Sequence, residues 1–139
     1  MTNRTSGILM HITSLPGKFG IGTFGQSAYD FVDFLAETKQ TYWQILPLTT
    51  TSYGDSPYVS FSTIAGNTHL IDFDFLVEEG LLAPEDFQDV NFGDNPEKVD
   101  YALIYQARRP ILEKAVQAFL QDDKKKTAFL EFEKANSSW

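Results

Sequence analysis

Two apolar segments, Gly7-Ile-Leu-Met-His-Ile12 and Thr41-Tyr-Trp-Gln-Ile-Leu-Pro47, decide the fold of this sequence. Short apolar runs bounded by turn-forming residues are typical of strands that are buried on both faces. The stretch between them, Gln26 to Thr38, carries apolar side chains at helical spacing, namely Ala28, Phe31, Val32 and Leu35. Strand, helix and strand in this order predict a βαβ unit with two parallel strands and a right-handed crossover.

The sequence after Asp72 changes to helical patterns. We expect helices over residues 75–79, 101–120 and 127–134, and a short turn that begins at Pro84. The longest helix is expected to bury the side that carries Leu103, Ala107, Ile111 and Ala115. Two parallel strands do not make a self-sufficient sheet, because parallel sheets need several strands and cover on both faces. We therefore expect the 139 residues to be the opening piece of a larger α/β domain.

Composition and charge exclude several classes of protein. Eleven Lys and Arg against nineteen Asp and Glu give a net charge of −8, which argues against nucleic-acid and anionic-membrane partners. The absence of cysteine excludes disulfide scaffolds, Cys-based zinc sites and thiol nucleophiles. No segment reaches the roughly 18–20 apolar residues of a membrane span, and no apolar signal core follows the first residues. We expect a soluble, cytoplasmic protein.

A glycine-rich stretch, Gly20-Ile-Gly22-Thr-Phe-Gly25, matches the dinucleotide-binding pattern and precedes the predicted helix. A nucleotide site needs its first glycine directly after the strand, but Thr13 to Phe19 intervene. The second strand also ends in Leu46-Pro47-Leu48, where an acidic residue for the ribose would stand. A glycine-rich loop is the favoured interpretation, and a nucleotide-binding βαβ protein is a rival.

The sequence has two histidines, His11 and His69. Neither has a second histidine or a carboxylate at metal-ligand spacing, so we expect no metal site. A lone histidine at a strand end is more often a structural hydrogen-bonding group than a catalytic one, and both roles stay open.

The segment from Leu48 to Leu70 fits neither helix nor strand, and its most informative part is Tyr53-Gly-Asp-Ser-Pro-Tyr58. Segments of this length without helix or strand in compact domains are usually functional or disordered. Two tyrosines, a phenylalanine and an isoleucine make disorder the weaker interpretation. Sugar recognition needs a flat aromatic face together with carboxylate and hydroxyl groups, and this loop supplies all of them. It also follows the carboxyl end of a parallel strand, where α/β folds place ligands. An ordered turn whose tyrosines pack for stability is an equally good interpretation of the composition.

A series of motifs in one order resembles the amino-terminal part of bacterial 4-α-glucanotransferases, the amylomaltases. The resemblance is strong from about Ser6 to Leu82 and looser through Val99-Asp-Tyr101 and Arg108-Arg-Pro110. The motifs that carry it are Ser6-Gly-Ile-Leu-Met-His11, Thr13-Ser-Leu-Pro-Gly17, Gly20-Ile-Gly22, Tyr42-Trp-Gln-Ile-Leu-Pro-Leu48, Tyr53-Gly-Asp-Ser-Pro-Tyr58, Ser60-Phe-Ser62 and Ala65-Gly-Asn67.

The resemblance implies an α/β fold in which this chain is the N-terminal part of a (β/α)8 barrel. Residues 1–71 would hold the first two parallel strands and the sugar-binding loop, and residues 72–139 a helical inserted subdomain. The chain would then be truncated relative to the family. The implied reaction transfers 1,4-α-glucan segments between maltooligosaccharides with retention, by double displacement and without a cofactor or metal. The family's catalytic carboxylates lie on later strands, so no catalytic residue is assigned within residues 1–139.

The resemblance also implies roles for four loop residues. Tyr58 resembles the tyrosine that stacks on a glucosyl ring, Ser56 the serine that hydrogen-bonds it, and Asp55 would orient that turn. Tyr53 resembles an aromatic residue at a secondary glucan-binding surface. Two departures border the loop, since Ile12 replaces a frequent proline and Thr49 to Ser52 replace a glycine-rich stretch.

Two further expectations follow. The isolated 139-residue chain should have no transferase activity, because the catalytic carboxylates would be supplied by the rest of the same barrel. The alternative is a stand-alone maltodextrin-binding module, or an inactive remnant, that kept the aromatic loop without catalysis.

Overall fold

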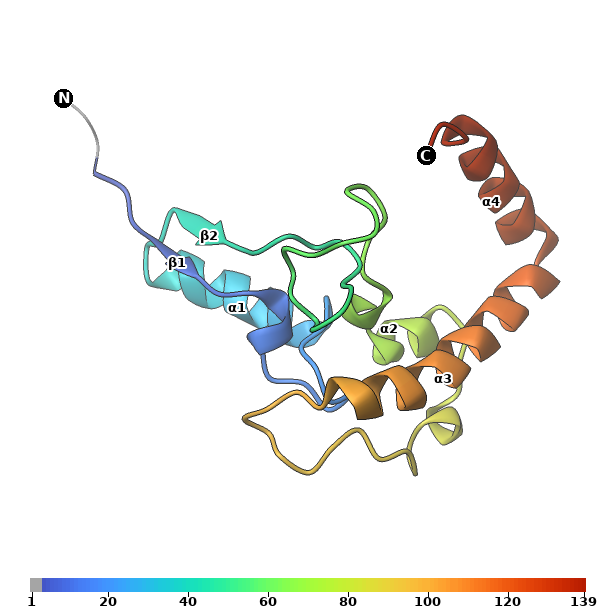
Figure 1. The fold of residues 1–139 in the computed structure, drawn as a ribbon, viewed down its shortest axis with the longest axis horizontal. Helices are drawn as coiled ribbons and strands as arrows, with labels where there is room; N and C mark the ends of the chain where they lie inside the picture. Colours follow the sequence, from blue (N-terminus) through green and yellow to red (C-terminus); the bar gives the residue numbers. More distant parts are fainter. Residues whose placement is uncertain (1–3) are drawn as a thin grey trace.

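The computed structural model describes residues 4–139, so the first three residues of the predicted 1–71 segment lie outside the described part. Figure 1 shows two short strands beside one helix, followed by a long loop and further helices. The strands and helices are β1 (Gly7–Leu9), α1 (Gln26–Glu37), β2 (Tyr42–Gln44), α2 (Phe73–Glu78), α3 (Tyr101–Gln121) and α4 (Asp123–Ala135). Three 3-10 turns join them, at Ile12–Ser14, Thr68–Leu70 and Pro84–Asp86.

The two strands pair in parallel, as predicted, with Gly7 opposite Tyr42 and Leu9 opposite Gln44. Each strand is only three residues long, so the predicted strands over 7–12 and 41–47 are too long. The chain turns after His11 because Ser14 and Leu15 donate backbone hydrogen bonds to the two carbonyls that begin the 3-10 turn. That turn sends the Ile12 side chain into a core instead of along a sheet.

The prediction that the strands are buried on both faces is wrong for the described residues. Leu9 is 59% exposed and Tyr42 is 61% exposed. One small core covers the strands from the α1 side, built from Ile12, Leu15, Ala28 and Leu70, with Met10, Phe31, Trp43 and Leu48 packed against it. Residues 4–139 place no second layer over the opposite side, because the other helices gather around a different core.

The larger core joins the glycine-rich loop to the helical part of the chain. Phe19 packs against Phe73 and Phe87, with ring centroids 4.9 and 5.4 Å apart. The remaining members are Leu82, Phe92, Ile111 and Ala115. Leucine, isoleucine and phenylalanine side chains each contribute about 1.5–3 kcal/mol when fully buried, so this cluster is a main source of stability.

The helical part follows the predicted order with three differences. Helix α2 begins at Phe73, capped by the Asp72 carboxylate, which accepts from the Asp74 N–H. Helix α4 begins at Asp123, four residues earlier than expected, because Asp122 accepts from two backbone N–H groups of its first turn. Helix α3 runs from Tyr101 to Gln121 through Pro110.

None of the helices in residues 4–139 is long and apolar enough to cross a membrane.

The third difference is the buried side of α3, which is rotated from the predicted one. Ile111 and Ala115 are buried as predicted, but Ile104 and Arg108 take the places expected for Leu103 and Ala107. The cause is Arg108, which is fully buried. A pattern that counts arginine as a surface residue cannot place it in a core.

The Arg108 guanidinium ties α3 to two earlier segments. It donates to the carbonyl oxygens of Phe19 and Ile71, and it stacks over the Phe73 ring at 4.2 Å. Burial lowers the pKa of Arg108 to about 10, while the Asp72 carboxylate opposes that shift. The group therefore stays protonated at neutral pH.

His69 is buried, and His11 is half-buried. The Nδ1 atoms of His11 and His69 are buried and have no hydrogen-bond partner within the described part of the chain. Burial lowers the pKa of each histidine, because the charged form loses its hydration. At His69 the positive charge of Arg108 lowers the pKa further.

Replacement of Arg108 should destabilise the protein strongly. We expect Arg108→Met to lower the free energy of unfolding by about 2–4 kcal/mol. The carbonyl oxygens of Phe19 and Ile71 would lose their guanidinium donor, and the Asp72 carboxylate would lose the positive charge near it. Arg109→Met is the matched control, since Arg109 is exposed and pairs with Glu113 one turn away. Its loss should be about 0.5 kcal/mol or less. Urea denaturation measures both, and equal losses would contradict this role for Arg108.

The histidines predict a loss of stability in mild acid. An unfolded histidine takes up a proton as the pH falls through about 6.5, whereas the folded one, with its lowered pKa, resists protonation. The unfolding free energy should therefore fall from pH 7.5 to pH 5.5, and His69→Phe should reduce that fall. Urea denaturation at the two pH values measures it, and an undiminished fall in the variant would argue against His69.

Candidate functional site

The predicted sugar-binding loop is an ordered excursion between β2 and α2 (green in Figure 1). Its base is closed by an antiparallel bridge between Thr49 and Gly66. Nearer the tip, the Ser52 N–H donates to the Val59 carbonyl at 2.9 Å, which brings the two ends of the 53–58 turn together. The prediction that this segment contains neither helix nor regular strand before the 3-10 turn at Thr68 is confirmed.

The two tyrosines of this turn project into solvent. Tyr53 is 98% exposed and Tyr58 is 73% exposed. Within residues 4–139, neither ring is buried against another part of the fold. A ring held free in solvent on an ordered turn offers a flat apolar face to a ligand.

Ser56 forms a hydrogen bond within the turn, whereas Asp55 forms one with helix α3. The Ser56 hydroxyl oxygen accepts from the Tyr58 N–H at 3.3 Å, a local bond that leaves the hydroxyl proton available to donate elsewhere. Asp55 has a φ of +55°, in the left-handed region that aspartate tolerates better than most residues. Its Oδ1 accepts a hydrogen bond from the Tyr105 hydroxyl at 3.0 Å.

Tyr105 was not among the residues predicted for the site. It lies on α3, fifty residues from Asp55, and its hydroxyl is also 3.3 Å from the Thr51 Oγ1. The only related signal in the sequence is that Tyr101 and Tyr105 lie one helical turn apart, which places both on one side of the predicted helix. No local pattern could pair that helix with a loop fifty residues earlier.

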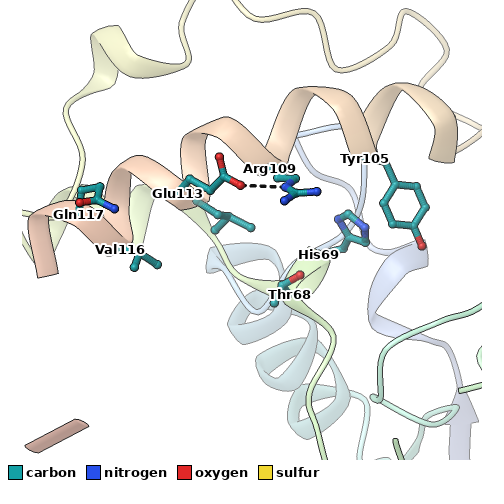
Figure 2. A pocket seen from close by; sticks show the side chains of 8 residues that line it. Thr68, His69, Tyr105, Arg109, Glu113, Val116 and Gln117 are labelled. Carbon is teal, nitrogen blue, oxygen red and sulfur yellow. Dashed lines mark hydrogen bonds and ion pairs between the residues drawn. The ribbon is translucent and has the colours of Figure 1, made fainter. Parts of the chain in front are cut away.

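His69 lies beside Tyr105, as Figure 2 shows. The two rings meet edge to face, with centroids 4.6 Å apart and planes at 80°. The negative charge of Asp55 raises the pKa of His69 and so partly offsets the lowering by burial. Burial raises the pKa of the neighbouring Tyr101, and Asp55 adds to that shift, so this hydroxyl stays protonated at neutral pH.

A cavity of about 380 Å³ extends along α3 from this pair of rings. Its walls come from α3 and from the 3-10 turn at Thr68–Leu70, and the Arg109–Glu113 ion pair, 2.8 Å long, crosses its rim (Figure 2). Within residues 4–139, no three His, Asp or Glu side chains gather as a metal site would require.

The glycine-rich loop uses its glycines for close packing. A Cβ on Gly22 would lie 2.0 Å from the Ile12 carbonyl oxygen, and one on Gly25 would lie 2.0 Å from an Asp72 carboxylate oxygen. Gly25 is the N-cap residue of α1. The Asp72 carboxylate therefore stands at the helix N-terminus where a phosphate would have to bind, which disfavours the nucleotide alternative.

Comparison with known proteins agrees with the motifs. The family model described as 4-alpha-glucanotransferase matches residues 10–139. A 4-alpha-glucanotransferase of Streptococcus pneumoniae is 63% identical over 139 residues, which are all of this chain and 27% of the relative. One from Thermus thermophilus is 43% identical over 138 residues, covering 98% of this chain and 27% of the relative.

A solved structure shares the fold. The amylomaltase from Streptococcus agalactiae in complex with acarbose is 59% identical, with a TM-score of 0.93, over 97% of this chain and 27% of that one. The chain spans about a quarter of the length of the curated relatives it matches. It belongs to the 4-alpha-glucanotransferase family.

Proposed function

We propose that this chain works as the first part of a 4-alpha-glucanotransferase that transfers 1,4-α-glucan segments between maltooligosaccharides. The observation that carries the proposal is the ordered turn 53–58, which presents the exposed ring of Tyr58 next to the hydroxyl of Ser56. The relatives named 4-alpha-glucanotransferase, and the amylomaltase solved with acarbose, support it. Membership of the family favours this function over a stand-alone maltodextrin-binding module.

The proposed architecture is a (β/α)8 barrel whose first two strands are β1 and β2. Residues 1–71 supply these strands and the sugar-binding loop, and residues 72–139 form a helical inserted subdomain. The exposed apolar side chains of Leu9, Tyr42 and Ile45 support the proposal, because neighbouring strands and their helices would cover them. The rest of the same barrel is then the first partner of this chain, and its cytoplasmic location stays a prediction.

The reaction we propose is a double displacement with retention. One carboxylate attacks the anomeric carbon and forms a glycosyl-enzyme ester, while a second carboxyl group about 5–5.5 Å away protonates the oxygen of the leaving glucan. The second group then deprotonates the acceptor hydroxyl, whose oxygen attacks the anomeric carbon and releases the first carboxylate. Both carboxylates would come from later strands of the barrel. This chain would hold the acceptor, with the Tyr58 ring against a glucosyl face, the Ser56 hydroxyl on its OH groups, and Tyr53 at a secondary glucan-binding surface.

Removal of the Tyr58 ring should weaken acceptor binding. We expect Tyr58→Ala, in the complete enzyme, to raise the KM for a maltose acceptor roughly tenfold, since ring contacts contribute about 0.5–1.5 kcal/mol beyond area burial. Ser56→Ala should raise it by a smaller factor. Tyr29→Ala, which removes an exposed tyrosine from α1, is the control and should leave that KM unchanged. Initial rates with saturating starch donor measure all three, and an unchanged KM in Tyr58→Ala would contradict the proposed role of the loop.

The polypeptide of residues 1–139 alone should be inactive, because it lacks the proposed catalytic carboxylates. Incubation with maltotriose followed by mass spectrometry should show unchanged substrate. Free glucose and longer maltodextrins would contradict the proposal.

A further inference from the structure

His11 lies between the end of β1 and the 3-10 turn, and hydrogen bonds fix the backbone on both sides of it. The Met10 N–H donates to the Gln44 carbonyl at 3.0 Å, so the pairing with β2 continues up to this point. The Trp43 indole N–H donates to the Met10 carbonyl at 2.7 Å. The His11 carbonyl accepts from the Ser14 N–H at 3.0 Å. The imidazole is therefore carried by a backbone segment with little freedom to move.

The side chain of His11 lies on the side of β1 that faces away from α1. Met10 and Ile12, its two neighbours, pack in the small core together with Ala28 of α1. The backbone of His11 is extended, with φ −77° and ψ 149°, so its side chain points opposite to those of its neighbours, as in a strand. Leu9, two residues earlier, lies on the same side and is exposed. His11 thus belongs to the side of the β1–β2 pair opposite to α1.

This side is the interior of the proposed barrel. The helices of a (β/α)8 barrel form its outer ring, and the strand side chains that point away from them fill the centre. The layer nearest the carboxyl ends of the strands borders the active site. His11 is the last side chain on the interior side before the chain enters the 3-10 turn, and the sugar-binding loop follows β2 at the same edge. The proposed barrel therefore has the His11 imidazole in the floor of its glucan-binding cleft.

The imidazole is suited to donate a hydrogen bond, and it is poorly suited to transfer a proton. Its Nδ1 atom is buried and has no hydrogen-bond partner within residues 4–139. A proton on Nδ1 would be a buried donor without an acceptor, so the neutral ring carries its proton on Nε2. Burial lowers the pKa of His11, which keeps the ring neutral at neutral pH. A proton-transferring histidine needs an acceptor that orients its Nδ1–H, and this buried atom is out of reach of one from later strands.

We propose that His11 is a substrate-binding residue: its Nε2–H donates a hydrogen bond to a hydroxyl group of the glucosyl unit whose bond is broken. That unit must lie over the centre of the barrel, because the carboxylates that attack and protonate it would stand on strands that surround the centre. The inference rests on the proposed function and deepens it, since it adds a residue of the barrel floor to the acceptor residues of the 53–58 turn.

Two amide side chains give a matched pair of variants in the complete enzyme. The amide nitrogen of glutamine reaches the position of Nε2, and that of asparagine reaches the position of Nδ1. His11→Gln should therefore keep the hydrogen bond to the sugar, whereas His11→Asn and His11→Leu should lose it. We expect kcat/KM for maltotriose to fall about tenfold in His11→Asn and His11→Leu, and by less than about threefold in His11→Gln.

Binding of acarbose gives a readout that does not depend on turnover. An amylomaltase of the same family has been solved with this saccharide. Isothermal titration calorimetry should show about tenfold weaker binding of acarbose to His11→Asn and His11→Leu, and nearly unchanged binding to His11→Gln. The KM for a maltose acceptor should stay unchanged in all three variants, because His11 contacts the sugar on the other side of the cleaved bond.

The outcomes separate this inference from the proposed function. If Tyr58→Ala raises the acceptor KM while His11→Leu keeps full kcat/KM and acarbose affinity, the role of His11 is wrong and the proposed function stands. Equal losses in His11→Gln and His11→Asn would also overturn it, because they would show that the ring matters for packing and its Nε2–H does not. A change confined to the acceptor KM would contradict contact with the reacting sugar. If the His11 variants behave as expected while Tyr58→Ala leaves the acceptor KM unchanged, the role of His11 stands and that of the loop fails.

Discussion

The buried guanidinium of Arg108 is the contact on which the arrangement of this chain depends. A buried guanidinium needs hydrogen-bond acceptors nearby, because it has lost its contacts with water. The acceptors of Arg108 are the carbonyl oxygens of Phe19 and Ile71. Those carbonyls belong to the glycine-rich loop and to the segment before α2, while Arg108 belongs to α3. One side chain thus fixes three segments that are distant in the sequence.

The position of the candidate site follows from this contact. Tyr105 precedes Arg108 by three residues on α3, so the burial of Arg108 sets the direction in which the Tyr105 hydroxyl points. Asp72 adds a second connection, because its carboxylate caps α2 and accepts from the Thr23 hydroxyl of the glycine-rich loop. The 53–58 turn is connected to this arrangement through Tyr105, whose hydroxyl donates to Asp55.

Local patterns predicted the parallel pairing of β1 and β2, helix α1, the order of the later helices, and a loop without helix or strand between β2 and the turn at Thr68. They failed where distant residues decide the structure. The strands stop at Leu9 and Gln44 because a 3-10 turn redirects the chain, and the buried side of α3 rotates because arginine enters the core. Tyr105 could not be assigned to the site, since its partner Asp55 lies fifty residues away and belongs to no shared motif.

In the proposed function, residues 53–58 form part of the glucan-binding site. A crystal structure of the complete enzyme with a bound maltooligosaccharide tests it most directly. We expect a glucosyl ring stacked on Tyr58, with the Ser56 hydroxyl within hydrogen-bond distance of the sugar and Asp55 still bonded to Tyr105. A saccharide bound elsewhere in the active site, with the 53–58 turn free of sugar, would contradict it.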